Sequence, residues 1–235
     1  ITSGGGTGGH IFPAIAIANE LKNQIPDIDI LFVGANNRME MKRVPEAGYP
    51  IKGIDMYGLQ RSLSLKSILA NLKLPFRLWR SLRKAKKIIA VFKPDVVIGV
   101  GGYVSGPVLK MAAAKHIPTL IQEQNSYPGI TNKMLAKNAR TICTAYDNLE
   151  KYFPIEKTVK TGNPVRNDII NLSNDKTQAY AYFGLDAHKK TVSVIGGSLG
   201  ARTINEGITN IIENFVNEDV QLIWQTGEYY YASIP

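Results

Sequence analysis

The chain of 235 residues is 44% hydrophobic and 20% charged, a balance typical of a globular protein with a buried core. No apolar stretch approaches the roughly 18–20 residues that a membrane-spanning helix needs, and a single cysteine, Cys143, excludes a disulfide framework. The formal net charge of +9 indicates an anionic partner or surface.

Short apolar runs alternate along the chain with longer segments of helical pattern. The runs are typical of strands that are buried on both faces. Such alternation predicts an α/β fold, in which helices cover both sides of a parallel sheet. In chain order we expect a strand ending at residue 3, a helix at 13–24, a strand at 28–33, helices at 65–92 with a break near Pro75, a strand at 96–100, a helix at 107–115, a strand at 119–122, a helix at 132–137, strands at 140–143 and 192–195, a helix at 202–216 and a strand at 221–224.

A boundary between two domains is expected near Gly162-Asn163-Pro164, where the chain enters a polar stretch before a further helix and strand. Residues 1–165 then form one domain of ordinary size, and residues 166–235 form only the beginning of a second. The chain starts at Ile1 rather than Met, close to a glycine-rich loop, whereas a first strand usually has about 5–6 residues. We therefore expect the sequence to be a piece of a longer protein.

Three glycine-rich loops each follow a predicted strand and precede a predicted helix. At such a junction, unpaired backbone N–H groups and the positive end of the helix face a ligand, and glycine lets the backbone come close to it. One loop of this kind is often only a tight turn, but three predict a phosphorylated substrate at the carboxyl ends of the strands. The loops are Ser3-Gly4-Gly5-Gly6-Thr7-Gly8-Gly9-His10, Gly99-Val100-Gly101-Gly102-Tyr103-Val104-Ser105-Gly106 and Gly196-Gly197-Ser198-Leu199-Gly200-Ala201-Arg202.

The first loop also fits the G-x-G-x-x-G pattern of dinucleotide-binding folds through Gly4, Gly6 and Gly9. That pattern requires an acidic residue at the end of the second strand to bind a ribose, and the segment Phe32-Val33-Gly34-Ala35-Asn36 has none. Arg38 leaves an NADP-dependent oxidoreductase as the alternative function. A Walker A loop is excluded, because the required lysine is absent.

Polar side chains beside these loops are candidates for proton transfer and sugar binding. His10 opens the first helix and either acts as a general base or packs on the turn, and its spacing leaves both open. Glu123 and Asn125 follow the strand at 119–122, at the end where such a sheet places its site. Glu123 is suited to act on a proton or orient a neighbour, and Asn125 to bind sugar hydroxyls; a solvated loop is the alternative. No cluster has metal-ligand spacing, so we expect no protein-bound metal.

The segment between Asp55 and Asp95 has many lysines and arginines and no acidic residue. Its large apolar residues fall at spacings of three or four on the predicted helices and form one stripe among the cations. The usual outcome is a helix with one buried side and a solvated basic face, but the missing acids and an aromatic pair favour an anionic lipid surface. Nucleic acid is the competing partner, and the sequence has no recognised nucleic-acid motif. The residues expected to touch the membrane are Leu69, Lys73, Phe76, Arg77, Trp79 and Arg80.

Five short segments, spread over essentially the whole chain, point to a known family: Gly5-Gly6-Thr7-Gly8-Gly9-His10-Ile11-Phe12-Pro13, Gly101-Gly102-Tyr103-Val104-Ser105-Gly106-Pro107, Glu123-Gln124-Asn125, Thr161-Gly162-Asn163-Pro164-Val165-Arg166 and Gly196-Gly197-Ser198-Leu199-Gly200-Ala201-Arg202. In this order they resemble the signature segments of the MurG family. These peptidoglycan transferases add N-acetylglucosamine (GlcNAc) to undecaprenyl-pyrophosphoryl-MurNAc-pentapeptide (lipid I) to give lipid II. The resemblance implies a GT-B fold with two Rossmann-like domains. It also implies an inverting transfer from UDP-GlcNAc, with no cofactor and no tightly bound metal.

The resemblance further implies roles for particular residues. His10 would be the base that activates the C4 hydroxyl of the acceptor, with Glu123 in support. Gly101, Gly102 and Tyr103 would bind the pyrophosphate of the acceptor. The implied contacts of UDP-GlcNAc are Thr7, Gly8, Gly9, Asn125, Arg166 and Ser198.

A lipid-linked acceptor implies a peripheral enzyme at the cytoplasmic face of the bacterial cell membrane, with lipid I and the anionic membrane surface as partners. Residues 1–165 would bind the acceptor and the membrane, and residues 166–235 would begin the UDP-GlcNAc-binding domain. Members of the family continue beyond this point with the rest of the donor pocket, so we expect this chain alone to be inactive. The third loop has Ser-Leu-Gly where relatives often have Ser-Gln-Gly, a difference we expect to be tolerated.

Overall fold

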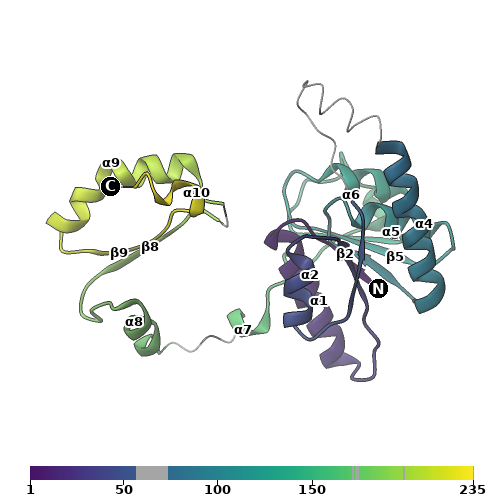
Figure 1. Ribbon diagram of the computed structural model, residues 1–235, viewed down its shortest axis with the longest axis horizontal. Coiled ribbons are helices and arrows are strands. Elements are labelled where there is room, and N and C mark those ends of the chain that lie inside the picture. Colours follow the sequence, from purple (N-terminus) through teal and green to yellow (C-terminus); the bar gives the residue numbers. More distant parts are fainter. Residues whose placement is uncertain (57–73, 171, 173–174, 198, 235) are drawn as a thin grey trace. The chain divides into compact units, whose positions relative to one another are not determined.

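The computed structural model describes residues 1–56, 74–170, 172, 175–197 and 199–234 (Figure 1). It divides into two compact units, Ile1–Ile170 and Asn171–Pro235. The roles that the sequence assigns to residues 1–165 and 166–235 stay predictions.

The first unit is built on a seven-stranded sheet in the order β3-β2-β1-β4-β5-β6-β7, and every neighbouring pair is parallel. Thr2 of β1 pairs with Phe32 on one side and with Ile98 on the other. The strand order therefore reverses between β1 and β4, which is the switch point where α/β sheets bind ligands. The strands are β1 (Thr2–Ser3), β2 (Phe32–Ala35), β3 (Ile51–Ile54), β4 (Val97–Gly99), β5 (Thr119–Glu123), β6 (Thr141–Thr144) and β7 (Thr158–Lys160).

Helices cover both faces of this sheet (Figure 1). On one face, Ile11 and Ile15 pack against Phe32 of β2. On the other, Leu109 packs in a cluster with Val33, the next residue of the same strand, because successive side chains of a strand point to opposite faces. This arrangement confirms the predicted α/β fold. The helices are α1 (Gly8–Gln24), α2 (Glu40–Glu46), α4 (Leu74–Phe92), α5 (Ser105–Ala113), α6 (Ile130–Leu135) and α7 (Asn167–Ile170), with 3-10 turns at Ala136–Asn138 and Ile155–Lys157.

The strands that the sequence pattern missed, β3 and β7, form the two edges of the sheet. Within β3 only Ile54 is fully buried, and the side chains of β7 are half-buried or exposed. An edge strand has a neighbour on one side only, so it does not need the continuous apolar run that marks a strand buried on both faces.

Two predicted elements begin at least four residues away from the observed ones. The strand expected at 28–33 begins at Phe32, and the turn before it ends at Ile28, whose N–H donates to the Ile25 carbonyl over 3.1 Å. The first helix begins at Gly8 rather than at residue 13, and Pro13 lies inside it. Proline is most frequent in the first turn of a helix, so its position in the sequence places the start too late.

Helix α4 carries the described part of the basic segment. Its bounds are Leu74–Phe92, so Pro75 lies in its first turn, and the helical piece predicted before this residue lies outside the described residues. Ser81, Ala85 and Ile89 are buried at a spacing of four residues and face the sheet. Leu69 and Lys73, predicted to touch a membrane, lie outside the described residues.

The second unit contains a strand–helix–strand arrangement. Strand β8 (Thr191–Ile195) pairs in parallel with β9 (Gln221–Gln225), and α9 (Arg202–Asn217) connects them. Helix α8 (Thr177–Phe183) precedes β8, and α10 (Glu228–Tyr231) follows β9. The strands predicted at 192–195 and 221–224 and the helix predicted at 202–216 are confirmed.

Candidate active site

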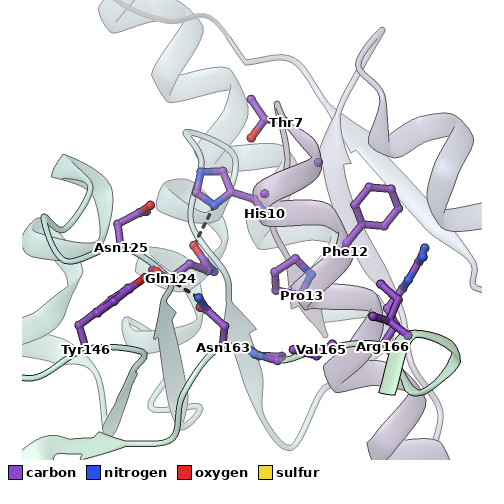
Figure 2. A pocket seen from close by; sticks show the side chains of 14 residues that line it. Thr7, His10, Phe12, Pro13, Gln124, Asn125, Tyr146, Asn163, Val165 and Arg166 are labelled. Atoms are coloured by element: carbon purple, nitrogen blue, oxygen red, sulfur yellow. Dashed lines mark hydrogen bonds between the residues drawn. The ribbon is translucent and has the colours of Figure 1, made fainter. Parts of the chain in front are cut away.

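A cavity of about 810 Å³ opens in the first unit, beside the carboxyl ends of the central strands. Its walls come from the loop after β1, the first turns of α1, the ends of β5 and β6, and the segment that follows β7 (Figure 2). Sequence positions more than a hundred residues apart therefore meet in one place. The lining residues are Thr7, Gly8, Gly9, His10, Phe12, Pro13, Gln124, Asn125, Tyr146, Asn163, Pro164, Val165, Arg166 and Ile169.

The first glycine loop presents the amino end of α1 to this cavity. Thr7 is the extended residue before the helix, and its carbonyl accepts the N–H groups of His10 and Ile11 at 3.1 and 3.2 Å. Gly8 and Gly9 line the cavity in the first turn, where backbone N–H groups have no partner within the helix. Together with the helix dipole, these groups make the loop suitable for binding an anion such as a diphosphate.

His10 faces the cavity, and its ring orientation is set by Gln124. The Nδ1 atom of His10 lies 3.2 Å from Oε1 of Gln124. The amide of Gln124 is itself oriented, because Nε2 donates to the Val100 carbonyl over 2.9 Å and also contacts Oε1 of Gln122. Its Oε1 is therefore an acceptor toward His10, so the neutral imidazole carries its proton on Nδ1. In that tautomer Nε2 is the acceptor that a general base requires.

The second glycine loop packs against His10 and the first loop. Gly101 has φ +95°, and a Cβ atom there would lie 2.8 Å from Cε1 of His10. Gly102 has φ +79°, and a Cβ atom there would overlap the Gly5 carbonyl. Both glycines are needed for this close approach. Tyr103 is 57% exposed, and none of these three predicted acceptor residues lines the cavity; their role toward an acceptor stays a prediction.

Glu123 lies below the site rather than in it. Its side chain is 1% exposed and does not line the cavity. One carboxylate oxygen accepts the backbone and side-chain N–H groups of Asn125, both at 3.0 Å, and the other accepts from Gly129 at 3.1 Å and Asn132 at 2.8 Å. Glu123 is therefore placed to hold Asn125 at the cavity wall.

Arg166 brings positive charge to the cavity. Its guanidinium carbon lies 5.0 Å from the centre of the Phe12 ring, which orients the side chain through a cation–π contact. A guanidinium group suits the oxygens of a phosphate. Ser198, predicted to contact the donor, lies outside the described residues.

Several lining residues were not predicted from the sequence. Gln124 stands within the Glu-Gln-Asn segment, but only the fold shows that it reaches His10. Tyr146 follows β6, and Asn163 donates to the Gln124 carbonyl over 3.4 Å. Tyr146 carried no sequence signal, whereas Asn163 lies in one of the motifs. Among the residues that the structure describes, no group of histidine, cysteine and carboxylate side chains is arranged to hold a metal ion.

The third glycine loop belongs to the second unit. Gly200 has φ +77° and packs so closely on the Thr226 carbonyl that a Cβ atom would overlap it. The same carbonyl accepts the side-chain N–H of Asn205 over 2.9 Å, and the indole of Trp224 donates to Asn205 over 3.2 Å. Asn205 is 3% exposed, so one buried amide joins the start of α9 to the end of β9.

Residues 1–144 match the glycosyltransferase family 28 N-terminal domain. The chain belongs to glycosyltransferase family 28. Two curated relatives are named UDP-N-acetylglucosamine–N-acetylmuramyl-(pentapeptide) pyrophosphoryl-undecaprenol N-acetylglucosamine transferase. The one from Parabacteroides distasonis is 57% identical over 232 residues, which are 99% of this chain and 62% of the relative. The one from Christiangramia forsetii is 56% identical over 231 residues, which are 98% of this chain and 62% of the relative.

A solved structure of a family 28 relative agrees with the fold. The crystal structure of Acinetobacter baumannii MurG superposes with a TM-score of 0.66 at 27% sequence identity, covering 99% of this chain and 61% of that one. These matches confirm the predicted resemblance to the MurG family and the predicted GT-B class. The family 28 chain described here spans about 62% of the length of the curated relatives.

Proposed function

We propose that this chain is part of an inverting glycosyltransferase that moves GlcNAc from UDP-GlcNAc to the C4 hydroxyl of MurNAc in lipid I, giving lipid II. The observation that carries the proposal is the His10–Gln124 pair, which orients an imidazole ring at a cavity beside a helix amino terminus that is suited to an anion. The names of the relatives give the substrates of those relatives, and the residues that line the cavity support the same chemistry here.

The reaction follows from the groups that face the cavity. Nε2 of His10 accepts the proton of the acceptor hydroxyl as its oxygen attacks C1 of GlcNAc. The new bond from C4–O to C1 forms on the face opposite the leaving UDP, so the bond from C1 to the phosphate oxygen breaks with inversion. UDP departs with the electron pair of that bond. The first-turn N–H groups of α1 and the guanidinium of Arg166 stabilise the negative charge that develops on the diphosphate.

The remaining predicted residues take supporting roles in this proposal. Thr7, Gly8, Gly9 and Asn125 contact the donor, and Glu123 acts as a positioning residue for Asn125 rather than exchanging protons. Gly101 and Gly102 keep the second loop close to His10. In this proposal the first unit binds the acceptor and the second begins the donor-binding domain.

The amino-terminal half of α4 supports attachment to a membrane surface. Phe76 and Trp79 are 61% and 48% exposed, and their rings stack with centroids 5.9 Å apart. The guanidinium carbon of Arg83 lies 4.6 Å from the centre of the Trp79 ring. An exposed aromatic pair among arginines suits an anionic lipid interface. No helix among the described residues is long and apolar enough to cross a bilayer. We propose peripheral attachment at the cytoplasmic face of the bacterial cell membrane.

Release of UDP by the full-length parent chain tests the proposed reaction. UDP-GlcNAc is supplied with and without a soluble lipid I analogue, and UDP is measured by a coupled assay. Release that depends on the acceptor is expected. A well-folded parent chain that releases no UDP in the presence of both substrates contradicts the proposal.

A further inference from the structure

A buried carboxylate lies under the first glycine loop. Glu40, the first residue of α2, is 0% exposed. Its Oε1 accepts the N–H of Ala35, the last residue of β2, over 2.9 Å. Its Oε2 accepts the N–H of Gly6 over 3.0 Å. One side chain thus joins the end of a strand to the loop that opens α1.

Two glycines leave room for this carboxylate. A Cβ atom on Gly34 would lie 2.5 Å from Cγ of Glu40, and a Cβ atom on Gly5 would overlap Oε1. Neither glycine has a positive φ, so the backbone itself does not require glycine at these two positions. A side chain at Gly5 would therefore displace Glu40, and one at Gly34 would displace Glu40 and Ile51.

The bond to Glu40 determines which loop amides are left for a ligand. Gly6 has φ +91° and directs its N–H at the carboxylate. The chain then passes through the extended Thr7 into α1. Because the N–H of Gly6 is engaged, the N–H groups of the first turn of α1 are the ones that face the cavity.

We propose that Glu40 is a positioning residue for the donor diphosphate, acting through the Gly6 amide and the loop that leads to Gly8 and Gly9. This inference rests on the proposed function. The loop is held by Glu40 at Gly6 and by α1 after Thr7. The backbone N–H groups of Gly8 and Gly9 therefore already have the geometry that binds the diphosphate, and the loop loses less conformational freedom when the ligand binds.

The test compares donor binding and turnover in the full-length parent chain with Glu40→Gln. Glutamine keeps the size of the side chain but has one acceptor oxygen, and its NH₂ group faces one of the two N–H donors. We expect the Kd for UDP-GlcNAc, measured by calorimetry, to rise about tenfold, because a hydrogen bond to a charged group is lost. Glu46→Gln is the matched control: Glu46 ends the same helix, is exposed, and pairs with Arg43 at 2.9 Å. Its Kd should equal that of the wild type.

A second variant acts on the same carboxylate from the other side. Gly5→Ala places a methyl group where Oε1 lies and should raise the Kd by a similar factor. The double variant Glu40→Gln, Gly5→Ala should then bind no more weakly than the weaker single variant, because both changes remove one interaction. The single variant Gly5→Ala also keeps the proposal testable if Glu40→Gln fails to fold.

Three results overturn the proposal: a lower melting temperature for Glu40→Gln with an unchanged donor Kd, losses that add fully in the double variant, or a wild-type chain that does not bind UDP-GlcNAc. Donor binding without acceptor-dependent UDP release contradicts only the proposed function, and the Kd comparison still decides the role of Glu40.

Discussion

His10 combines a place at the cavity with a defined protonation pattern. Nδ1 of its ring forms a hydrogen bond with Oε1 of Gln124, and the amide of Gln124 is oriented by its own hydrogen bond to the Val100 carbonyl. The sequence left open whether this histidine is a base or packs on a turn. Its position at the cavity wall and the orientation of its ring by Gln124 favour the base.

Replacing His10 with alanine should lower acceptor-dependent UDP release by about a hundredfold to ten-thousandfold, because the general base is lost. The Kd for UDP-GlcNAc and the circular dichroism spectrum should stay close to those of the wild type. The control is His188→Ala, since His188 is an exposed histidine of the second unit. Turnover of the His10 variant at the rate of the control would remove His10 from the mechanism.

Gln124→Leu should lower kcat by about tenfold or more and leave the Kd for UDP-GlcNAc nearly unchanged. Leucine removes the acceptor that holds the proton on Nδ1 of His10, so both tautomers become populated and the ring can turn. Steady-state kinetics with both substrates measure this effect. An unchanged kcat would show that Gln124 does not orient the histidine.

At the scale of elements, α4 has two different halves. Its carboxyl-terminal half is anchored to the sheet through Ala85 and Ile89, whereas Phe76 and Trp79 in its first turns stay exposed among arginines. The members of the predicted apolar stripe that the structure describes, Phe76 and Trp79, therefore lie on an exposed side of the helix. Burial of Ser81 marks where the helix meets the sheet.

The double variant Phe76→Ser, Trp79→Ser should bind vesicles containing phosphatidylglycerol about tenfold more weakly in sedimentation assays. Burying one large apolar side chain contributes about 1.5–3 kcal/mol, so loss of two partly inserted rings is sufficient for this effect. Val91→Ser is the control, because Val91 is 76% exposed at the far end of the same helix. If the double variant and the Val91→Ser control bound the vesicles equally well, the membrane contact would lie elsewhere in the chain.

At the scale of the whole molecule, the parallel sheet and its glycine loops are shared by nucleotide-binding enzymes of several kinds. The alternative of an NADP-dependent oxidoreductase rested on Gly4, Gly6, Gly9 and Arg38. In the structure, the N–H of Gly6 donates to the buried carboxylate of Glu40 at the start of α2, so this carboxylate is not available to a ribose. The transferase reaction proposed for this member of glycosyltransferase family 28 uses a sugar nucleotide instead.

The full-length parent chain should therefore bind UDP-GlcNAc and show no saturable binding of NADPH. Calorimetry with each nucleotide measures this difference, and the fluorescence of NADPH provides a second readout. UDP alone serves as a positive control for the uridine nucleotide. Saturable NADPH binding that UDP-GlcNAc does not displace would restore the oxidoreductase alternative.

The sequence by itself determined the alternation of strands and helices, the three glycine loops and the motif residues, because these depend on local pattern and on backbone requirements of a few residues. The edge strands β3 and β7 were not predicted, because an edge strand has a neighbouring strand on one side only and does not need a continuous apolar run. Only the tertiary structure decided that Gln124 bonds His10, that Glu123 lies below the cavity, and that Glu40 holds the first loop. The contacts of Gln124 with His10 and of Glu40 with Gly6 join segments that follow different strands, so they depend on how the strands pair. The burial of Glu123 depends on which face of the sheet its side chain occupies.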